Sequence, residues 1–239
     1  MGIKYKRILL KLSGEALAGS KGFGIDASIA SQIADDIADI HSDGIQIGIV
    51  IGGGNMIRGA TAQGVSRVAG DTMGMLATVI NSIALKEYLE SRNIPARVLN
   101  AVNIDKAGEF YTPELAIEYL NRGSVVILAG GTGNPYFTTD TAAALRCAEI
   151  NAEVLLKATK VDGVYDSDPV KNPAAVRFET LSHSEALARG LKVMDGTAFS
   201  FCLENSIDII VFKLLEKGNL RRCVEGQPIG SIVKTGGKS

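Results

Sequence analysis

Short, almost continuously apolar runs alternate along this chain with segments of helical periodicity, and no other feature of the sequence constrains the fold as strongly. Such runs are typical of strands covered on both faces, because a half-exposed strand alternates apolar and polar residues. Ile29, Ile33, Ile37 and Ile40 recur at the spacing of one helix face and predict a helix that ends near Gly44. The predicted strands are Arg7–Leu12, Gln46–Ile51, Ala96–Val102, Ser124–Ala129, Val154–Thr159 and Asp208–Phe212.

Further helices are predicted between the later strands. Thr112-Pro113 begins one, since proline suits the first helical position, and Ser182–Glu185 begins another as a capping box. Two more are marked by the residues Leu76, Val79, Ile80, Ile83 and Leu89 and by the segment Thr141–Asn151. This alternation predicts a mostly parallel sheet between two helical layers. Because no flexible linker divides residues 1–239, we expect one α/β domain, a three-layer αβα sandwich, with ligands beyond the carboxyl ends of its strands.

Composition excludes several classes of function. The 25 Lys and Arg residues balance 26 Asp and Glu residues, for a net charge of -1, so we expect no nucleic-acid partner and no membrane partner. Cys147, Cys202 and Cys223 are far apart and form no CxxC pair, which predicts buried, reduced thiols and no protein-built metal site. Lys6 does not fit a myristoylation motif, and neither a signal peptide nor an 18-residue apolar span is evident, so we expect a cytoplasmic protein.

Two loops that follow predicted strands combine a cation with small residues. Lys11 lies near the end of the first strand and is followed by Leu12-Ser13-Gly14, whose backbone N–H groups suit a phosphate. A solvated lysine at a strand end is the commoner explanation. The second loop, Gly52–Gly59, contains three consecutive glycines, expected to adopt positive φ beside a ligand, and then Arg58. A sharp turn without a ligand is the alternative. Neither the Rossmann fingerprint nor the P-loop pattern is present.

Two later loops are also candidates for ligand binding. Gly130–Asp140 is rich in glycine and hydroxyl side chains and leads directly into a predicted helix, so its backbone N–H groups would face a ligand above the sheet. Thr159–Pro169 contains three Asp residues, but their spacing is not that of a calcium-binding loop. A loop that holds an adenine and a ribose fits this segment better.

Seven motifs in one order resemble the bacterial uridylate kinases of the amino acid kinase superfamily, from about Tyr5 to Val233. The motifs are KLSGEAL (Lys11–Leu17), GFGID (Gly22–Asp26), IGGGNMIRG (Ile51–Gly59), GDTMGMLAT (Gly70–Thr78), TGNPYFTTD (Thr132–Asp140), KATKVDGVYDSDP (Lys157–Pro169) and LKVMD (Leu191–Asp195). The resemblance implies an amino acid kinase-like fold and reversible phosphoryl transfer from ATP to UMP, giving UDP and ADP, in the biosynthesis of UTP and CTP. Mg²⁺ would arrive with ATP.

The resemblance also implies which residues act, with UMP mainly in the N-terminal part and ATP mainly in the C-terminal part. The implied catalytic residues are Lys11, Arg58, Asp140 and Asp195. The implied ATP-binding residues are Lys11, Leu12, Ser13, Gly14, Gly54, Arg58, Thr159, Tyr165 and Asp168. The implied UMP-binding residues are Gly53, Asp71, Thr132, Gly133, Asn134, Pro135, Tyr136, Phe137, Thr138 and Thr139. Asp140 and Asp195 would orient Lys11 or the metal, since the UMP phosphate is already anionic and needs no general base.

Regulation is implied by the same resemblance: a homohexamer activated by GTP and inhibited by UTP. We assign the GTP response to a segment just before the first helix, which three glycines make mobile and in which Lys21 offers a cation and Phe23 an apolar anchor. A solvated connecting loop is the alternative. The segment is Gly19, Ser20, Lys21, Gly22, Phe23 and Gly24. Two other functions stay open: a superfamily kinase for carbamate, acetylglutamate, glutamate or aspartate, and a nucleotide- or molybdate-binding storage protein.

Overall fold

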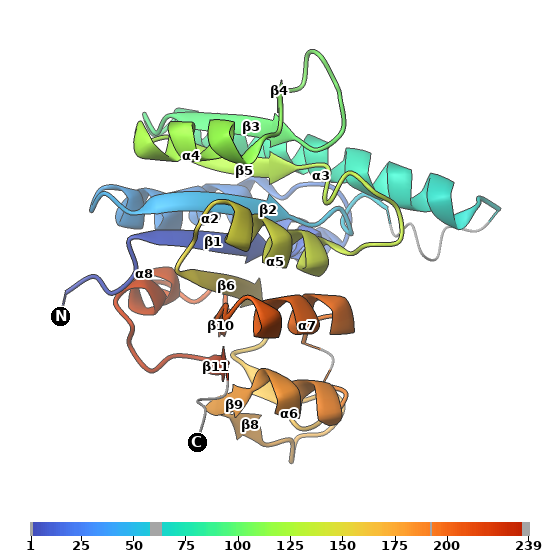
Figure 1. Cartoon of the computed structure of the whole chain (residues 1–239), viewed down its shortest axis with the longest axis vertical. Helices are drawn as coiled ribbons and strands as arrows, with labels where there is room; N and C mark the ends of the chain where they lie inside the picture. Colours follow the sequence, from blue (N-terminus) through green and yellow to red (C-terminus); the bar gives the residue numbers. More distant parts are fainter. Residues whose placement is uncertain (1, 58–63, 192, 236–239) are drawn as a thin grey trace.

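The computed structural model describes residues 2–57, 64–191 and 193–235. In these residues nine strands form one sheet, in the order β4-β3-β5-β2-β1-β6-β10-β11-β9 (Figure 1). Every neighbouring pair in it is parallel except β10 and β11, which are antiparallel. The strands are β1 (Arg7–Leu12), β2 (Gln46–Ile51), β3 (Ala96–Asn100), β4 (Glu109–Phe110), β5 (Val125–Ala129), β6 (Val154–Thr159), β9 (Thr180–Ser182), β10 (Ile209–Lys213) and β11 (Ser231–Lys234). The predicted mostly parallel sheet is therefore confirmed.

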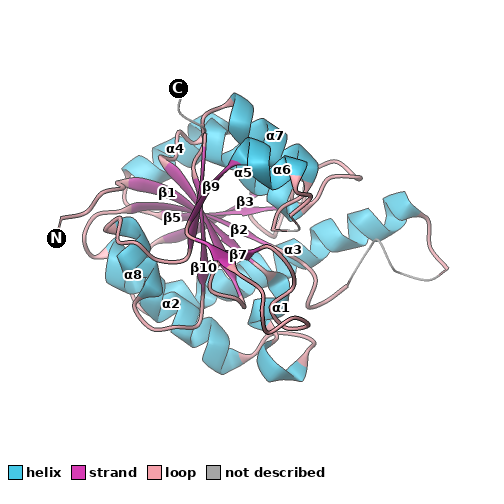
Figure 2. Ribbon diagram, turned by 90° about the horizontal axis from the view of Figure 1, so that it is seen from below, coloured by secondary structure: helices cyan, strands magenta, loops and turns pink. Residues whose placement is uncertain are grey.

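Helices cover both faces of this sheet, as the two views in Figure 1 and Figure 2 agree. One face is covered by α2 (Ala27–His41), α3 (Arg67–Glu90) and α8 (Asn219–Val224), and the other by α4 (Pro113–Asn121), α5 (Thr139–Glu149), α6 (His183–Ala188) and α7 (Gly196–Glu204). Two short elements, α1 (Gly14–Leu17) and the 3-10 turn η1 (Gly19–Lys21), follow β1, and β7 (Val164–Tyr165) pairs with β8 (Arg177–Phe178) in a separate ribbon. The three-layer αβα sandwich is confirmed.

The strands divide their side chains between two hydrophobic cores. In β1, Ile8 and Leu10 face the core under α2, α3 and α8, whereas Leu9 faces the core under α4, α5 and α7. The pattern follows from the period of two in a strand, and it explains why these strands are apolar throughout. Lys11 has the parity of Leu9, and Lys157 of β6 has the parity of Leu155, so both lysines point to the α5 and α7 side.

Several predicted boundaries were wrong. β3 ends at Asn100 rather than Val102, because the chain turns there and the Asn100 side chain donates to the carbonyl of Ala107 at 2.9 Å. β10 runs one residue later than predicted, at Ile209–Lys213. α5 begins at Thr139, two residues earlier than predicted, since the hydroxyl of Thr138 caps the helix.

Helix α3 also differs from its prediction. Val79 and Leu89 are buried, but Leu76, Ile80 and Ile83 are 44%, 51% and 41% exposed, so the predicted apolar positions lie on two faces. The statement that no 18-residue apolar span exists was too strict, because α3 is long and apolar enough by length and composition to cross a membrane. It packs on β3 and β5, and it buries the polar side chains of Thr78, Asn81 and Ser82. The predicted burial of the cysteines is confirmed: Cys147, Cys202 and Cys223 are buried and unpaired.

Candidate active site

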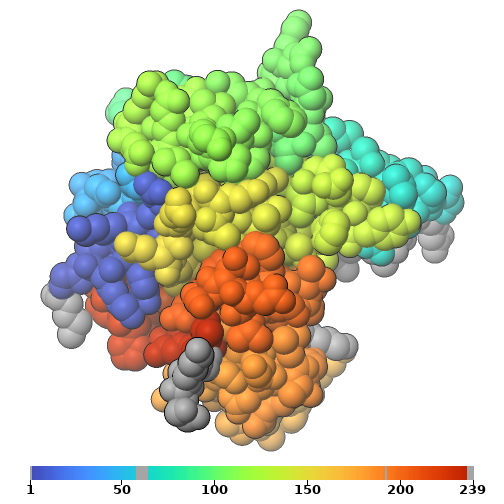
Figure 3. Space-filling model, in the orientation of Figure 1, coloured from blue at the N-terminus to red at the C-terminus, as the bar shows by residue number. Residues whose placement is uncertain are grey.

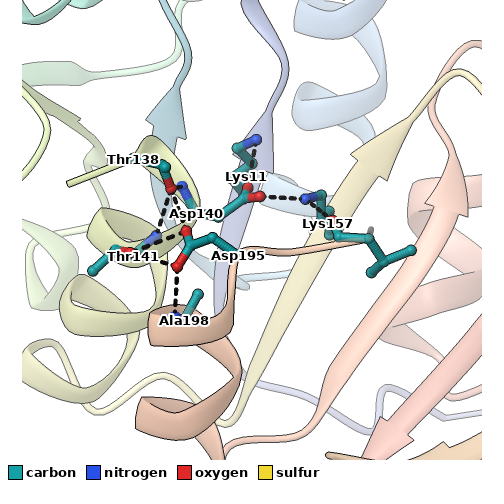
Figure 4. Close-up of polar contacts among 8 residues, drawn as sticks. Lys11, Thr138, Asp140, Thr141, Lys157, Asp195 and Ala198 are labelled. Carbon is teal, nitrogen blue, oxygen red and sulfur yellow. Dashed lines mark hydrogen bonds and ion pairs between the residues drawn. The ribbon is translucent and has the colours of Figure 1, made fainter. Parts of the chain in front are cut away.

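Lys11 and Lys157 stand side by side near the carboxyl ends of two central strands. β1 and β6 pair in parallel with Lys11 directly beside Lys157, and both residues are only 8% exposed. The first turn of α5 places Asp140 over them (Figure 4). Its Oδ1 lies 2.7 Å from Lys11 Nζ, and its Oδ2 accepts a hydrogen bond from Lys157 Nζ at 2.6 Å. One carboxylate is thus shared by two ammonium groups.

The electrostatics of this trio keep Asp140 ionised. Burial alone would raise the pKa of Asp140, but the ammonium groups of Lys11 and Lys157 outweigh it and hold that pKa below its usual value. Burial lowers the pKa of Lys157 to about 8, although Asp140 opposes that change. Asp140 Oδ1 is buried, and its ion pair with Lys11 lacks the geometry of a hydrogen bond.

Asp195 joins the first turns of α5 and α7. It accepts a hydrogen bond from the hydroxyl of Thr138 and, at 3.0 Å, from that of Thr141, and it caps α7 by accepting from the backbone N–H of Ala198 at 2.9 Å (Figure 4). Its carboxylate touches neither lysine, so in this structure Asp195 fixes the helix that carries Asp140. The predicted contact of Asp195 with Lys11 is not observed.

A first cavity of about 110 Å³ lies between the glycine loop after β2, the first turns of α3 and the loop after β5. Six of the predicted UMP residues line it: Gly53, Asp71, Thr132, Asn134, Phe137 and Thr139. Gly133, Pro135, Tyr136 and Thr138 belong to the same loop but do not line the cavity. Six further residues line this cavity without a predicted role: Ile57, Gly70, Gly74, Met75, Thr78 and Gly131.

Asp71 is oriented before any ligand binds. Its carboxylate pairs with Arg67 at 2.7 Å and accepts the backbone N–H of Tyr136 at 2.8 Å. Burial raises the pKa of Asp71, but these two partners outweigh it and leave that pKa below its usual value. Tyr136 has a φ of 72°, which is rare outside glycine, and the guanidinium of Arg67 lies 5.6 Å from the centre of its ring.

The glycine loop differs from its prediction. None of Gly52, Gly53 and Gly54 has a positive φ. Gly53 is required by packing instead, because a Cβ there would lie 2.7 Å from the carbonyl oxygen of Gly74 in α3. Asn81 of α3 also holds this loop: it donates to the carbonyl of Gly52 at 2.8 Å and exchanges hydrogen bonds with the buried amide of Asn55. Arg58, predicted to bind phosphate, lies outside the described residues.

A second cavity, of about 310 Å³, lies over the ends of β1 and β6. Lys11, Ser13 and Thr159 of the predicted ATP residues line it, together with Lys157. A larger cavity of about 570 Å³ shares Val161, Gly163 and Val193 with it and is lined by the predicted residues Tyr165 and Asp168.

The remaining ATP assignments are placed differently. Leu12 is fully buried in the core, so only its backbone can reach a ligand. A Cβ on Gly14 would lie 2.3 Å from the carbonyl oxygen of Gly52, so Gly14 brings the first two loops together. Gly54 lines the first cavity and not the second.

Three functional candidates carry no prediction from the sequence: Thr78, Arg146 and Lys157. Thr78 accepts the backbone N–H of Gly130 at 2.8 Å, and the buried Arg146 donates to the carbonyl of Gly131 at 3.2 Å, so both position the loop after β5. A signal existed for two of them. Lys157 is the single charge in the strand VLLKAT, and Arg146 interrupts the alanine-rich helix α5.

The segment Gly19–Gly24 contacts the glycine loop. Gly24 donates its N–H to the carbonyl of Asn55 at 3.1 Å, and the Asn55 amide donates to the carbonyl of Gly24 at 2.7 Å. Lys21 lies 3.7 Å from Asp26, which caps α2. Phe23 is 68% exposed, so it is not anchored in the core.

The described residues do not build a metal site of their own. No group of three or more His, Cys, Asp or Glu residues suited to a metal occurs within 2–57, 64–191 and 193–235. Beside the two lysines, Asp140 Oδ1 is buried and makes no hydrogen bond with the described residues. This donor set fits an Mg²⁺ ion that is held mainly by nucleotide phosphates, with at most one ligand from Asp140.

One cavity is lined by Thr139 at the start of α5, and a second by the two lysines that pair with the next residue, Asp140. Two cavities beside one helix N-terminus, on a sheet without a P-loop, are suited to a phosphotransferase. The chain belongs to the amino acid kinase family, whose family model matches residues 6–213. It is 53% identical over 232 residues to the uridylate kinase of Bacteroides thetaiotaomicron, covering 96% of this chain and 98% of that protein.

Solved structures agree with this family. The UMP kinase of Bacillus anthracis superposes with a TM-score of 0.93 at 36% identity, over 97% of this chain and 96% of that one. The UMP kinase of Ureaplasma parvum superposes with a TM-score of 0.89 at 37% identity, over 97% of this chain and 100% of that one.

Proposed function

We propose that this chain is a uridylate kinase, which transfers the γ-phosphoryl group of ATP to UMP and yields ADP and UDP. The observation that carries the proposal is the first turn of α5. Thr139 lines the first cavity, and the next residue, Asp140, holds the two lysines that line the second. Two nucleotides bound in these cavities would meet at one helix N-terminus, where backbone N–H groups and the helix dipole favour phosphates.

The assignment of nucleotides to cavities follows from their linings. The first cavity would take UMP, with Asp71 accepting hydrogen bonds from the ribose hydroxyls and with the Thr132–Thr139 loop around the base and phosphate. The second cavity would take the phosphates of ATP beside Lys11, and the adjoining cavity with Tyr165 and Asp168 would take its nucleoside. The N-terminal part of the single domain would thus bind mainly UMP and the C-terminal part mainly ATP.

The chemistry asks for positioning and charge stabilisation. The transition state of phosphoryl transfer is loose, and negative charge spreads over the oxygens of the transferred group. Lys11, fixed by Asp140, would stabilise that charge, together with the N–H groups at the start of α5. The attacking oxygen of UMP is already anionic, so no general base is needed. Mg²⁺ bound to ATP supplies further neutralisation of the phosphates when it is present.

An acceptor panel tests the proposal. ADP formation from ATP and Mg²⁺ is measured with UMP, CMP, dUMP, GMP, carbamate and acetylglutamate. UMP is expected to be the best substrate by far, because cytosine reverses the hydrogen-bond polarity at positions three and four and would leave buried polar groups unpaired. Comparable turnover of CMP or GMP, or a preference for a small acid, would overturn the assignment. Nucleotide binding without ADP formation would indicate the storage function instead.

We further propose the finer properties that the family resemblance implies: a homohexamer in the cytoplasm, activated by GTP, inhibited by UTP and supplying UDP for UTP and CTP. The exposed apolar side chains of α3 support self-association, and the buried thiols suit a reducing compartment. The contacts between Gly24 and Asn55 connect the Gly19–Gly24 segment to the glycine loop, which supports a regulatory role for that segment. Adding GTP or UTP to the UMP assay at subsaturating substrate tests the two effectors directly.

A further inference from the structure

The side chain of Arg146 is buried in α5, two helical turns after the start of that helix. Arg146 follows Thr139 by seven residues, so the two side chains leave the helix on nearly the same face. Thr139 lines the first cavity, whereas Arg146 is only 5% exposed and is not part of the lining. An arginine is rarely buried without partners, because a guanidinium group loses its hydration there. The partners of Arg146 therefore indicate its role.

Glu149 and Tyr111 hold the guanidinium group in place. Nη1 of Arg146 donates to Oε2 of Glu149 at 2.6 Å, and the same oxygen accepts the hydroxyl of Tyr111 at 2.6 Å. The guanidinium carbon lies 4.0 Å from the centre of the Tyr111 ring. Because the carboxylate of Glu149 offsets the charge of Arg146, this cluster acts on the cavity through its contacts and not through a net charge.

The remaining contact of Arg146 is with the loop after β5. Its Nη2 donates to the carbonyl of Gly131 at 3.2 Å. Gly131 is the second residue of a four-residue turn, which the N–H of Gly133 closes by donating to the carbonyl of Gly130 at 3.0 Å. The φ of Gly131 is 60°, in the region that favours glycine. The N–H of Gly130 donates to the hydroxyl of Thr78 at 2.8 Å, so α3 and α5 each hold one backbone group of this turn.

The carbonyl of Gly131 determines where the next N–H group points. Both groups belong to one planar trans peptide, in which the C=O and the N–H point in opposite directions. The carbonyl is turned toward Arg146, so the N–H of Thr132 is turned the other way, toward the cavity that Gly131 and Thr132 line. Within the described part of the chain this N–H makes no hydrogen bond, so it can donate to a ligand.

The order of the strands indicates which part of UMP meets this donor. Gly131 and Thr132 follow β5, which is separated from β1 and its Lys11 by β2. Neighbouring strands are about 4.8 Å apart, so β5 runs about 10 Å to the side of β1. The phosphate of UMP would lie near Lys11, so the base would lie toward β5. At position four uracil has a carbonyl acceptor, whereas cytosine has an amino donor.

We propose that Arg146 is a positioning residue for base selection: it holds the peptide between Gly131 and Thr132 so that the N–H of Thr132 donates to the position-four carbonyl of uracil. The proposal rests on the proposed kinase function and assigns the preference for uracil to one peptide group. Without Arg146 this peptide can turn over, since glycine tolerates most backbone conformations. The reversed peptide presents a carbonyl, which disfavours uracil and accepts the amino group of cytosine.

The experiment compares Arg146→Met with the wild type by ADP formation, with UMP and CMP as acceptors. The KM for UMP is expected to rise about tenfold, the size of one lost hydrogen bond, and the preference in kcat/KM for UMP over CMP to fall at least tenfold. At saturating UMP, kcat should stay within about threefold, as should the KM for ATP, because the base lies away from the reacting groups. Arg146→Lys should restore part of the preference, since an ammonium group can also donate to the carbonyl of Gly131.

Glu149→Gln tests the same proposal while Arg146 stays in place. It removes the charge that holds the guanidinium group, so the preference for UMP over CMP is expected to fall in the same direction but by less, about threefold. Melting temperatures are measured for each variant. If Arg146→Met does not fold, a folded Glu149→Gln with the wild-type preference overturns the proposal.

Arg122→Met is the matched control. The side chain of Arg122 is 67% exposed, pairs with Glu118 and lines neither cavity, so this variant should keep the wild-type KM for UMP and the wild-type preference. A folded Arg146→Met that keeps the wild-type preference overturns the proposal. An equal rise in KM for both acceptors also overturns it, because a general loosening of the loop does not reverse a peptide. If the wild type forms no ADP with UMP, the proposed kinase function fails instead.

Discussion

Asp71 is held from two sides, by Arg67 and by the N–H of Tyr136, with its carboxylate at the wall of the first cavity. Asp71→Ala is expected to raise the KM for UMP by about ten- to a hundredfold, since a charged hydrogen bond contributes roughly 1.5–3 kcal/mol. The KM for ATP should stay within about twofold, because Asp71 is absent from the cavities around Lys11 and Tyr165. Steady-state kinetics with each nucleotide varied in turn measures both constants.

Asp168→Ala is the reciprocal control for this prediction. Asp168 lines the cavity assigned to the nucleoside of ATP, so its loss should raise the KM for ATP and spare that for UMP. If Asp71→Ala moves the KM for ATP and not that for UMP, the two cavities have been assigned to the wrong nucleotides.

The sequence predicted which loops carry the site but not which side chains meet. Asp140 was a candidate from its motif, yet its bond to Lys157 depends on the pairing of β1 with β6, two segments about 145 residues apart in the chain, as the register of Lys11 with Lys157 shows. The local sequence pattern of either strand does not indicate which strand it pairs with. The same limit explains the glycine loop, where the constraint on Gly53 comes from the carbonyl of Gly74 in another element.

At the scale of elements, α2 places three acidic residues within five positions. Asp35 pairs with Arg92 at 2.7 Å, and Asp39 pairs with Arg221 at 2.5 Å, whereas Asp36 has no ion pair among the described contacts. Burial raises the pKa of Asp36 to about 6, and its neighbours Asp35 and Asp39 add to the effect. The folded protein therefore disfavours the ionised form of Asp36.

Asp36→Asn is expected to stabilise the protein at neutral pH. The cost of ionising Asp36 is absent below the unfolded pKa near 3.8, grows as pH rises, and is fully present above about 6. After allowance for solvent screening at this half-buried site, the gain should be about 1 kcal/mol at pH 7.5, or roughly 2–4 °C in Tm. At pH 4 the variant and the wild type should melt together.

Asp35→Asn is the control: it relieves part of the repulsion on Asp36 but also breaks the ion pair with Arg92, so its gain at pH 7.5 should be smaller than that of Asp36→Asn. Equal stabilisation by both substitutions would mean that general acidic repulsion on α2, and not the burial of Asp36, sets the effect. A gain for Asp36→Asn that persists undiminished at pH 4 would also contradict the explanation.

Long elements were predictable and short ones were not. The capping residues Thr112 and Ser182 and the apolar runs of β1, β2 and β6 fixed their elements locally. β4, β7 and β8 have two residues each, and their strand geometry exists only because a partner strand lies beside them. β11 belongs to the sheet because it pairs with β10 in the antiparallel direction, and the periodicity of its sequence does not predict this pairing.

At the scale of the whole molecule, α3 is apolar on two sides. Leu85 and Leu89 pack into the core, while Leu76, Ile80 and Ile83 stay 44%, 51% and 41% exposed on the opposite side. Figure 1 and Figure 3 show this helix, in cyan, projecting beyond the edge of the sandwich. A helix that is apolar on two opposite sides is usually buried on both of them. We therefore expect another protein surface to cover the exposed side of α3.

A second copy of this chain is the simplest cover, because two such helices can pack against each other about a two-fold axis and bury the same side chains twice. Ile80→Glu would place two carboxylates in that contact, and it is expected to lower the molar mass measured by light scattering at micromolar concentration. Val176→Glu is the matched control, since Val176 is 61% exposed but lies between the short strands β7 and β8. It should leave the mass unchanged. A wild type that is monomeric under these conditions, or an Ile80→Glu variant of unchanged mass, would show that α3 does not form the contact and would remove the structural support for a hexamer built through this helix.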